Sequence, residues 1–599
     1  MSDGSRTAGA TTGRENPFAT PSGRPWREDG YVDFFGYANA AGGWLFCGWC
    51  RYLGAPPAQP LQVVAYFQNG VVEGEALVTT YERQDLDGQG LGVVVMMPGP
   101  GRILGEFAGL AIRFAPGAEP LLVQTVRPVE YLRETDLVPR ARAAIMGSSG
   151  EARGRILALL SRQIFAGVDT LEQLTAPVLL EFDETVAVPP DGLVLVGWLL
   201  DPTGAVACIR IRSSNLASAP LSQHWLKTSR PDVVESAGTK YGLTNDRCGF
   251  IALAMDCVMP GEVIYAEIEL HNGEVAYRRV PRPLRRGLAA MRRILDVVKL
   301  APDEIEHAFD QVLGAPLLAI NQARLAAPRP CSEVRFGPVP EAPDCSIIVP
   351  LYGRMDFMHY QLALMSAADM SQHEFLFVLD DPPRKQELLG LAEAAWNKFG
   401  IPFRVLALEE NLGFAPANNV GLERARGRSI CFLNSDVMPH EPRWLDLMLE
   451  TLRADPGIGM VGALLLFEDG TVQHESMTYE RLPSLGNWPF PMHPNKGMLP
   501  APGGGVETVE AVTGACMVLS TELAREMGGF DEAFAVGDFE DSDLCFKIKR
   551  QGLRCVVDRR AVLWHLERQS QVTPDRMWRM YLTLQNAWIH TRRWFPQAE

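Results

Sequence analysis

Strand-like and helix-like segments alternate along the chain from Asp344 onward, and this pattern constrains the fold more than any other feature. Short apolar runs bounded by turn residues predict strands, whereas apolar residues at helical spacing predict helices. Strands that alternate with helices pair in parallel and form an α/β sheet. The predicted strands span residues 345–350, 375–379, 403–408 and 429–434, and the predicted helices span residues 355–368, 385–399, 415–425 and 442–454.

Functional candidates follow the carboxyl ends of these predicted strands. Pro350, Asp380, Asn411 and Asp436 all stand at such ends. Parallel α/β sheets bind their ligands in the crevice beyond the carboxyl ends of the strands. We therefore expect these four residues to border one crevice.

An acidic segment lies late in the same region, where residues 537–545 read Gly-Asp-Phe-Glu-Asp-Ser-Asp-Leu-Cys. Its carboxylates are close enough to repel one another, and burial would raise their pKa values. Such a segment is either a solvated helix start, which the helix dipole favours, or a site that binds a cation or transfers a proton. Asp436 at a strand end and His565 downstream favour a metal-assisted transferase site.

The N-terminal half predicts a different architecture. Residues 1–26 are rich in Ser, Thr, Gly, Ala and Pro, which predicts a disordered tail. Two β-rich regions follow, and short segments recur in the same order in both: residues 43–49 resemble 192–198, residues 61–67 resemble 205–211, and residues 92–96 resemble 249–253. Order-preserving similarity predicts a duplicated unit, and short strands separated by turns predict β-sandwiches.

The predicted domain organisation follows from these patterns. It comprises a β-sandwich-like domain at 27–135, a helical connector at 136–177, a second β-sandwich-like domain at 178–285, a helical segment at 286–327, a proline-rich linker at 328–343 and an α/β domain at 344–599.

Composition excludes some classes of protein. The net charge of −16 argues against a nucleic-acid-binding protein, which would carry a basic face. No apolar run approaches the length that spans a bilayer, and no signal pattern opens the chain, so we expect a cytoplasmic protein. Eleven scattered cysteines indicate reduced thiols. Cys47 and Cys50 have CxxC spacing but lie in a strand-like run, which disfavours a redox motif.

Several motifs of the C-terminal region resemble those of family 2 glycosyltransferases, which have the A-type nucleotide-sugar fold. The resemblance covers residues 344–596 and rests on these segments in order: Ser-Ile-Ile-Val-Pro-Leu-Tyr-Gly-Arg at 346–354, Asp380, Asn-Leu-Gly-Phe-Ala-Pro-Ala-Asn-Asn-Val-Gly at 411–421, Leu-Asn-Ser-Asp at 433–436, Thr-Gly-Ala-Cys-Met at 513–517, Gly-Gly-Phe-Asp-Glu at 528–532, Glu-Asp-Ser-Asp-Leu at 540–544 and Trp564-His565.

The resemblance implies an inverting transferase that moves a sugar from a nucleotide diphosphate donor to a glycan or lipid-linked acceptor in cell-surface polysaccharide synthesis. It implies that Asp436 and His565 hold Mn²⁺ or Mg²⁺, and that Asp541 is the catalytic base with Glu540 in support. The implied donor-binding residues are Pro350, Tyr352, Arg354, Asp380, Asn411, Gly413, Asn418, Ser435 and Gly514.

One departure from the family pattern is Asn434, which stands where the acidic metal motif often has its first Asp. A neutral amide attracts a cation less than a carboxylate does. The Asn form also occurs in the branch of the family that includes rhamnosyltransferase-like enzymes, to which this chain is similar.

Three alternatives remain open. Asn434 is compatible with a glycan-binding or scaffold protein whose transferase domain is degenerate. A nucleotidyltransferase would favour a Gly-rich phosphate loop with Lys or Arg after the first strand, which residues 351–356 do not match. The Trp- and Arg-bearing helix predicted at 577–595 either packs on its own domain or contacts the inner face of the membrane peripherally. The oligomeric state and the role of the β domains stay open.

Overall fold

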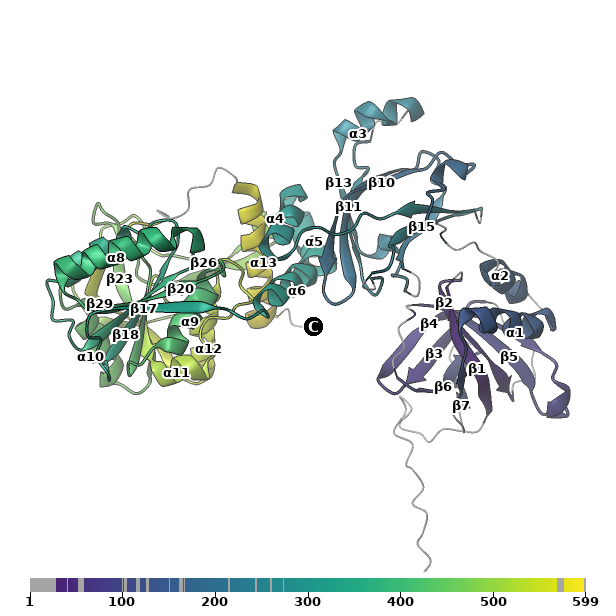
Figure 1. Ribbon diagram of the computed structural model, residues 1–599, viewed down its shortest axis with the longest axis horizontal. Coiled ribbons are helices and arrows are strands. Elements are labelled where there is room, and N and C mark those ends of the chain that lie inside the picture. Colours follow the sequence, from purple (N-terminus) through teal and green to yellow (C-terminus); the bar gives the residue numbers. More distant parts are fainter. Residues whose placement is uncertain are drawn as a thin grey trace, which may run out of the picture. The chain divides into compact units, whose positions relative to one another are not determined.

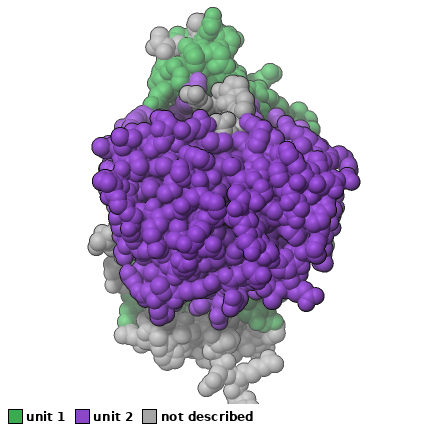
Figure 2. All heavy atoms as spheres, turned by 90° about the vertical axis from the view of Figure 1, so that its left-hand side faces the viewer, with its two compact units in different colours: residues 1–185, 190–283 green, residues 186–189, 284–599 purple. Residues whose placement is uncertain are grey.

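The chain divides into two compact units, which we describe separately (Figure 2). Unit 1 comprises residues 1–185 and 190–283, and unit 2 comprises residues 186–189 and 284–599. The computed structural model describes residues 29–39, 41–51, 59–99, 101, 105–114, 119–124, 129–149, 151–160, 165, 167–213, 216–242, 245–258, 261–272, 274–567 and 576–596. The tail predicted at 1–26 lies outside these residues.

The first half of unit 1 is a curved sheet with strand order β7-β6-β3-β4-β5-β2-β1-β8 and with β9 beside β4 (Figure 1). The long strand β4 pairs with β3 through residues 70–76 and with β5 through residues 77–81, so it joins two layers into one sheet. Aromatic residues fill the space between the layers, including Phe35, Trp44 and Phe67. The strands are β1 (Gly30–Ala38), β2 (Gly43–Cys50), β3 (Leu61–Phe67), β4 (Gly70–Tyr81), β5 (Leu91–Pro98), β6 (Phe107–Arg113), β7 (Leu121–Gln124), β8 (Glu130–Tyr131) and β9 (Ser148–Ser149).

Two helices cover the outer face of this sheet. Helices α1 (Glu134–Met146) and α2 (Glu151–Leu160) bury Leu137, Ile145 and Ile156 against β2, β4 and β5. The segment predicted as a helical connector therefore packs, through residue 160, on the first β domain. Cys47 faces these helices and Cys50 faces the opposite, aromatic layer. Both thiols are buried, and burial raises the pKa of Cys47, so the CxxC spacing does not form a redox pair here.

The second half of unit 1 contains two separate sheets. One has the order β10-β11-β14-β13 and the other has the order β12-β15-β16. Leu195 and Phe250 of the first sheet and Ile211 and Ile268 of the second share one core, as in a sandwich. The elements are β10 (Leu179–Val188), β11 (Gly192–Leu200), β12 (Val206–Arg212), β13 (Trp225–Thr228), the short helix α3 (Pro231–Ser236), β14 (Gly249–Ala254), β15 (Tyr265–Leu270) and β16 (Val275–Arg279).

The two halves share a pairing scheme. The order β1-β2-β5 corresponds to β10-β11-β14, and β7-β6-β3 corresponds to β16-β15-β12. These strands contain the segments that recur in the sequence, so the topology supports the predicted duplication. The halves differ where β4 bridges the layers, because its counterpart β13 is short and pairs only with β14. The first half is therefore one curved sheet, and not the predicted sandwich of two separate sheets.

Unit 2 is built on a mixed sheet of eleven strands with order β17-β20-β19-β18-β21-β28-β23-β29-β22, to which β24 and β27 add at β23 and β29. Strands β18, β19, β20 and β21 pair in parallel, as predicted. The strands are β17 (Cys331–Phe336), β18 (Cys345–Leu351), β19 (His373–Leu379), β20 (Phe403–Leu408), β21 (Ser429–Leu433), β22 (Val437–Pro439), β23 (Ile458–Leu466), β24 (Val472–His474), β27 (Val506–Val509), β28 (Cys516–Ser520) and β29 (Arg554–His565). A hairpin of β25 (Thr478–Leu482) and β26 (Trp488–Met492) forms a separate pair.

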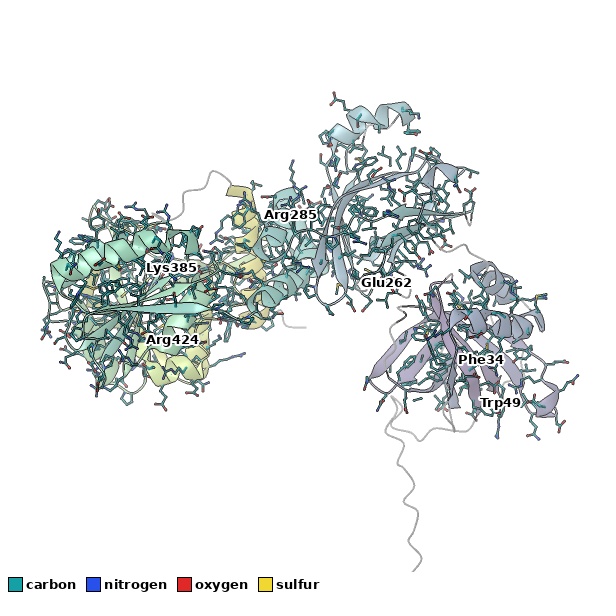
Figure 3. All side chains as sticks on the ribbon, in the orientation of Figure 1. Phe34, Trp49, Glu262, Arg285, Lys385 and Arg424 are labelled. Atoms are coloured by element: carbon teal, nitrogen blue, oxygen red, sulfur yellow. The ribbon has the colours of Figure 1, made fainter. Side chains whose placement is uncertain are left out.

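Helices cover both faces of this sheet. One face packs against α7 (Phe357–Met365), α8 (Lys385–Phe399) and α10 (Trp444–Ala454). The other face packs against α9 (Phe414–Arg424), α11 (Thr521–Glu526) and α12 (Glu540–Arg550). Figure 3 labels one residue from each helical layer: Lys385, the first residue of α8, and Arg424, the last residue of α9. The helices predicted between residues 355 and 454 are thus confirmed, with ends displaced by up to three residues.

Of the two segments predicted before residue 344, the helical segment is confirmed and the linker is wrong. Residues 331–336, which we expected in a linker, form β17 and pair antiparallel with β20 at the edge of the sheet. The helical segment at 286–327 forms α4 (Gly287–Val297), α5 (Ile305–Ala308) and α6 (Gly314–Leu325), which belong to unit 2. The prolines before residue 331 suggested a linker. Only three residues of the strand, Cys331, Val334 and Phe336, are apolar, so its sequence did not indicate a buried strand.

The C-terminal helix α13 (Arg576–Trp594) lies beside α4 and α6 (Figure 1). Tyr581, Leu584 and Ala587 are buried, Leu300 N donates to Tyr581 Oη at 3.0 Å, and Gln585 Nε2 donates to the Gly314 carbonyl at 2.9 Å. Of the two alternatives for this helix, packing on its own unit is therefore confirmed. None of the helices described has both the length and the apolar character needed to cross a membrane.

Candidate active site

Asp436 and His565 lie together at one edge of the unit 2 sheet. Asp436 directly precedes β22, His565 ends β29, and the antiparallel pairing of these strands places Val437 opposite His565. His565 Nε2 lies 3.5 Å from Asp436 Oδ1, and both side chains are largely buried. The structure thus brings together the two residues that the sequence suggested as metal ligands.

The second nitrogen of His565 is held by a residue that sequence reasoning missed. Gln473 on β24 is buried, and its Oε1 lies 2.9 Å from His565 Nδ1. Since this oxygen can only accept, Nδ1 carries a proton, and Nε2 is the ring nitrogen that faces the carboxylate of Asp436. Nothing in the sequence sets Gln473 apart from other strand glutamines.

This arrangement fits a divalent cation. Nε2 of His565 and Oδ1 of Asp436 can each donate a lone pair to one positive ion placed between them. Mn²⁺ and Mg²⁺ both accept oxygen ligands, and Mn²⁺ also takes imidazole nitrogen. Among the residues described, no group of three or more His, Cys, Asp or Glu side chains forms a complete metal site. The protein would therefore supply Asp436 and His565, and donor oxygens or water would supply the remaining ligands.

The turn before Asp436 is fixed through its backbone. Asn434 N donates to the Ala515 carbonyl at 2.9 Å. Gln361 Nε2 donates to the carbonyls of Asn434 and Val437 at 2.9 and 3.0 Å. Ser435 is also buried. The Oδ1 atom of Asn434 is buried and has no hydrogen-bond partner among the described residues, so this departure from the acidic pattern leaves an unused acceptor beside the proposed metal ligand.

Asp380 organises the loop that contains Asn411 and Gly413. Its Oδ1 accepts from Leu412 N at 2.6 Å, and its Oδ2 accepts from Gly413 N at 2.8 Å and from Asn411 Nδ2 at 3.2 Å. Burial raises the pKa of Asp380 to about 7, although these backbone donors oppose the increase. The carboxylate is thus occupied by the loop, and Asp380 shapes the loop by these contacts.

An arginine from the helical segment supports the same loop. Arg324 on α6 donates to the carbonyls of Asn411 and Leu412 at 3.2 and 3.0 Å. Gly413 begins the turn into α9 with φ at +97°, and an added Cβ would lie 3.1 Å from Cα of Val536. The loop is therefore held between α6 and the segment before the acidic helix, which the sequence alone did not indicate.

The other predicted donor-binding residues have different surroundings. Pro350 is the second-last residue of β18, and Tyr352, which follows this strand, is 53% exposed. Arg354 pairs with Asp356 at 2.7 Å and lies over the ring of Phe357. Asn418 is fully buried in α9, where its Nδ2 donates to the Phe414 carbonyl at 3.0 Å. Tyr352 is thus open to a ligand, whereas Asn418 serves the helix.

Asp541 stands in the first turn of α12 with both carboxylate oxygens engaged. Gly514 N donates to its Oδ2 at 2.9 Å, and Ser542 N donates to its Oδ1 at 2.7 Å. Burial raises the pKa of Asp541, and the two N–H groups oppose this increase. Gly514, predicted to bind the donor, therefore contacts the predicted base instead.

Glu540 is the least satisfied carboxylate of the acidic segment. It is 6% exposed, and its Oε2 has no hydrogen-bond partner among the described residues. Burial raises its pKa well above the ordinary value, and the negative charges of Asp541 and Asp538 add to the increase. Glu540 is therefore held in the neutral form over a wider pH range than an ordinary glutamate.

Asp543 does not act on Asp541 as we expected. It is fully buried but accepts from Arg593 and Trp594 at 2.6 and 2.8 Å, and Lys547 lies 3.1 Å away. These partners neutralise its charge. Besides burial, the charges of Asp541 and Asp538 raise the pKa of Glu540, and the charge of Asp538 raises the pKa of Asp541.

Two adjoining hollows lie beside His565 and Arg354. The larger, of about 600 Å³, lies beside His565 and is lined by Phe467, Glu468, Asp469, Lys496, His565, Leu566 and Glu567. The smaller, of about 310 Å³, is lined by Arg354, Phe357, Tyr360, Leu364, Met438, Glu468 and Leu566. Glu468 and Leu566 line both hollows, so a ligand that extends from one into the other would lie next to His565 and to Arg354, which follows β18.

Comparison with known proteins agrees with the resemblance read from the motifs. Residues 346–499 match the model of glycosyl transferase family 2, so the chain contains a domain of this family. The O-antigen biosynthesis protein RfbC of Myxococcus xanthus is 30% identical over 259 residues, which are 42% of this chain and 19% of that protein. The putative teichuronic acid biosynthesis glycosyltransferase TuaG of Bacillus subtilis (strain 168) is 29% identical over 147 residues, 23% of this chain and 56% of that protein. The chain thus spans only part of the length of these relatives.

Solved structures show a weaker similarity. A mannosyltransferase from Pyrobaculum calidifontis, solved in complex with GDP-Man and Mn²⁺, is 16% identical and has a TM-score of 0.28. The alignment covers 47% of this chain and 81% of that one.

Proposed function

We propose that this chain is an inverting glycosyltransferase that moves a sugar from a nucleoside diphosphate donor to a hydroxyl group of a glycan or lipid-linked glycan. The family 2 domain and the names of the two relatives support a role in cell-surface polysaccharide synthesis. The observation that carries the proposal is the pair of Asp436 and His565, 3.5 Å apart, in the same unit as the buried carboxyl of Glu540 and the half-buried carboxyl of Asp541.

In this proposal Asp541 is the general base. Its carboxylate takes the proton of the acceptor hydroxyl while the acceptor oxygen forms a bond to the anomeric carbon. The bond between that carbon and the diphosphate oxygen breaks at the same time, and the electron pair leaves with the diphosphate. A single displacement inverts the anomeric centre. A raised pKa brings a carboxylate closer to the value at which a base works well near neutral pH.

Asp436 and His565 would hold Mn²⁺ or Mg²⁺, and a divalent cation supplies neutralisation of the charge that develops on the leaving diphosphate. Gln473 orients His565 because its Oε1 accepts a hydrogen bond from Nδ1 of His565. Tyr352, Arg354, Ser435 and the loop at Asn411 and Gly413 would contact the donor, with Pro350, Asp380, Asn418 and Gly514 shaping the backbone around it.

Donor transfer is tested with a panel of nucleotide sugars, dTDP-rhamnose among them, by measuring nucleoside diphosphate release with and without Mn²⁺. We expect metal-dependent release with one donor and faster release with an added acceptor. The substitution Gln473→Leu should weaken Mn²⁺ affinity about 10–100-fold, because partners of a ligating histidine typically matter to that extent. The control Gln585→Leu, on α13, removes a buried amide that contacts Gly314 and should leave Mn²⁺ affinity unchanged.

The alternative of a glycan-binding or scaffold protein rests on Asn434, whose amide weakens cation binding relative to a carboxylate. This alternative predicts that no donor is hydrolysed or transferred with any divalent metal, while glycans still bind. Metal-dependent turnover of any nucleotide sugar would exclude it.

A further inference from the structure

The segment that leads into Glu540 and Asp541 has an unusual backbone. Val536, Asp538 and Phe539 have φ values of +66°, +88° and +74°. Residues other than glycine rarely adopt this left-handed region, and they persist in it only where surrounding contacts fix them. Phe539 is also the residue that caps the start of α12. The first turn of α12, with both carboxylates, therefore depends on what holds residues 535–539 in place.

Helix α13 presents a stripe of polar side chains to this segment. The stripe residues recur at spacings of four, three, four and three, which places them on one face of the helix. They are Arg579, Thr583, Asn586, His590 and Arg593. Each contacts the segment between residues 531 and 543.

Asn586 makes the largest number of these contacts. Its side chain is fully buried, and its Oδ1 accepts from Ala535 N at 3.1 Å. Its Nδ2 lies within donating distance of the carbonyls of Ala535, Gly537 and Asp538, at 3.2, 2.8 and 3.2 Å. One amide thus bonds the backbone on both sides of Val536 and at Asp538.

The neighbours in the stripe fix the side chains of the same segment. Thr583 Oγ1 donates to Asp538 Oδ2 at 2.7 Å, and Arg579 pairs with the same oxygen at 2.9 Å. His590 Nε2 lies 3.1 Å from Ser542 Oγ, which also donates to the Phe539 carbonyl at 3.0 Å. The segment reaches the donor loop as well, because Phe414 N donates to the Val536 carbonyl at 3.0 Å.

We propose that Asn586 is a positioning residue for the reaction: it holds residues 535–538 in the left-handed backbone that sets the place of Glu540 and Asp541. This inference rests on the proposed function. Without the amide, three carbonyls and one N–H of a strained segment lose a partner, and the segment relaxes toward ordinary conformations. A catalytic group displaced by about 1 Å can lower the rate by about 100-fold. Asn586 lies outside residues 346–499, which match the family model.

The test compares Asn586→Ala with the matched control Gln585→Ala in the full chain. Both side chains are buried amides at neighbouring positions of α13, but Gln585 contacts Gly314 of the helical segment instead. We expect Asn586→Ala to lower kcat about 10–100-fold with donor KM changed less than about threefold. Gln585→Ala should change kcat less than about threefold. Asn586→Asp keeps the volume and the acceptor but not the amide donors, and it should resemble Asn586→Ala.

Amide hydrogen exchange provides a readout that needs no donor. Exchange in the peptide that contains residues 535–541 should accelerate in both Asn586 variants and stay at the wild-type rate in Gln585→Ala. Equal kcat losses in the Asn586 and Gln585 variants, or unchanged exchange at 535–541, would overturn the positioning role. If the wild-type chain turns over no nucleotide sugar, the proposed function fails, and the exchange comparison alone then decides whether Asn586 holds the segment.

Discussion

Replacing Glu540 with Gln should stabilise the protein, and the gain should grow as pH rises. Glu540 is 6% exposed, its Oε2 lacks a partner among the described residues, and the charges of Asp541 and Asp538 oppose its ionisation. A buried polar group without a partner costs about 1–3 kcal/mol, and more when it is charged. Glutamine has nearly the same shape and is also polar, but it cannot ionise, so Glu540→Gln removes only the cost linked to ionisation and should gain on the order of 1 kcal/mol at pH 8.

The sign follows from the direction of the pKa change. The pKa of Glu540 is raised in the folded state, so the folded chain binds more protons than the unfolded chain above the ordinary carboxyl pKa of about 4.3. Stability is therefore lost as pH rises from that value toward the raised pKa. The advantage of Glu540→Gln should be absent near pH 4 and should increase between pH 5 and pH 8.

Asp531 provides a control, because its pKa is lowered in the folded state whereas that of Glu540 is raised. Burial alone would raise its pKa, but the Ala533 N–H and the Arg593 guanidinium lower it overall. A lowered pKa contributes stability that is complete above the ordinary Asp value and is lost only as pH falls through the folded pKa. Asp531→Asn should therefore destabilise by about 1 kcal/mol, uniformly between pH 5 and pH 8.

Thermal melting of the full chain from pH 5 to pH 8 measures both effects. About 1 kcal/mol moves Tm by about 2–4 °C in domains of 150–250 residues, so Glu540→Gln should raise Tm at pH 8 by a few degrees. A Tm difference that is independent of pH, or a Tm below that of the wild type at pH 8, would refute the assignment of Glu540 as an unpartnered buried carboxyl.

Further predictions concern the site and the unit that contains it. Asp541→Asn should lower turnover about 10²–10⁴-fold with donor affinity nearly unchanged, measured by steady-state kinetics and donor titration, because a base acts mainly in the transition state; near-normal transfer would contradict this role. Asp436→Ala and His565→Ala should each weaken Mn²⁺ and donor binding together in calorimetric titrations, since both act through one ion; a metal held elsewhere would exclude the pair. A fragment of residues 284–599 should fold and bind nucleotide, whereas residues 332–599 should not, because the shorter fragment loses α6 and the start of β17; a soluble, nucleotide-binding shorter fragment would show that the helices are dispensable.

The sequence was sufficient for elements whose pattern is local. The helix predicted at 385–399 has the observed ends of α8, and the strand predicted at 403–408 has those of β20. Asp436 and His565 were paired by motif resemblance, and their distance of 3.5 Å agrees. Local periodicity and family motifs are both visible in one chain without knowledge of its tertiary contacts.

Features that depend on contacts between residues far apart in the chain could not be predicted from the sequence. Strand β17 owes its existence to pairing with β20, and its sequence alone is polar and flanked by prolines. Gln473 acts only because β24 brings it to His565. Asp543 carries the same charge as Asp541, and only the structure shows that Arg593 and Trp594 compensate it.

Strand β17 also affects how the protein behaves at high concentration. Exposed apolar sheet edges recruit strands of other molecules and lead to aggregation, and charged residues or prolines on the outermost strand prevent this. Every residue of β20 is buried, and β17 covers its free side with a strand that carries Glu333 and Arg335 and is preceded by Pro328 and Pro330. A chain cut within β17 would leave β20 as an exposed apolar edge strand. Truncated chains should therefore form oligomers whose size grows with concentration, whereas the longer chain should not.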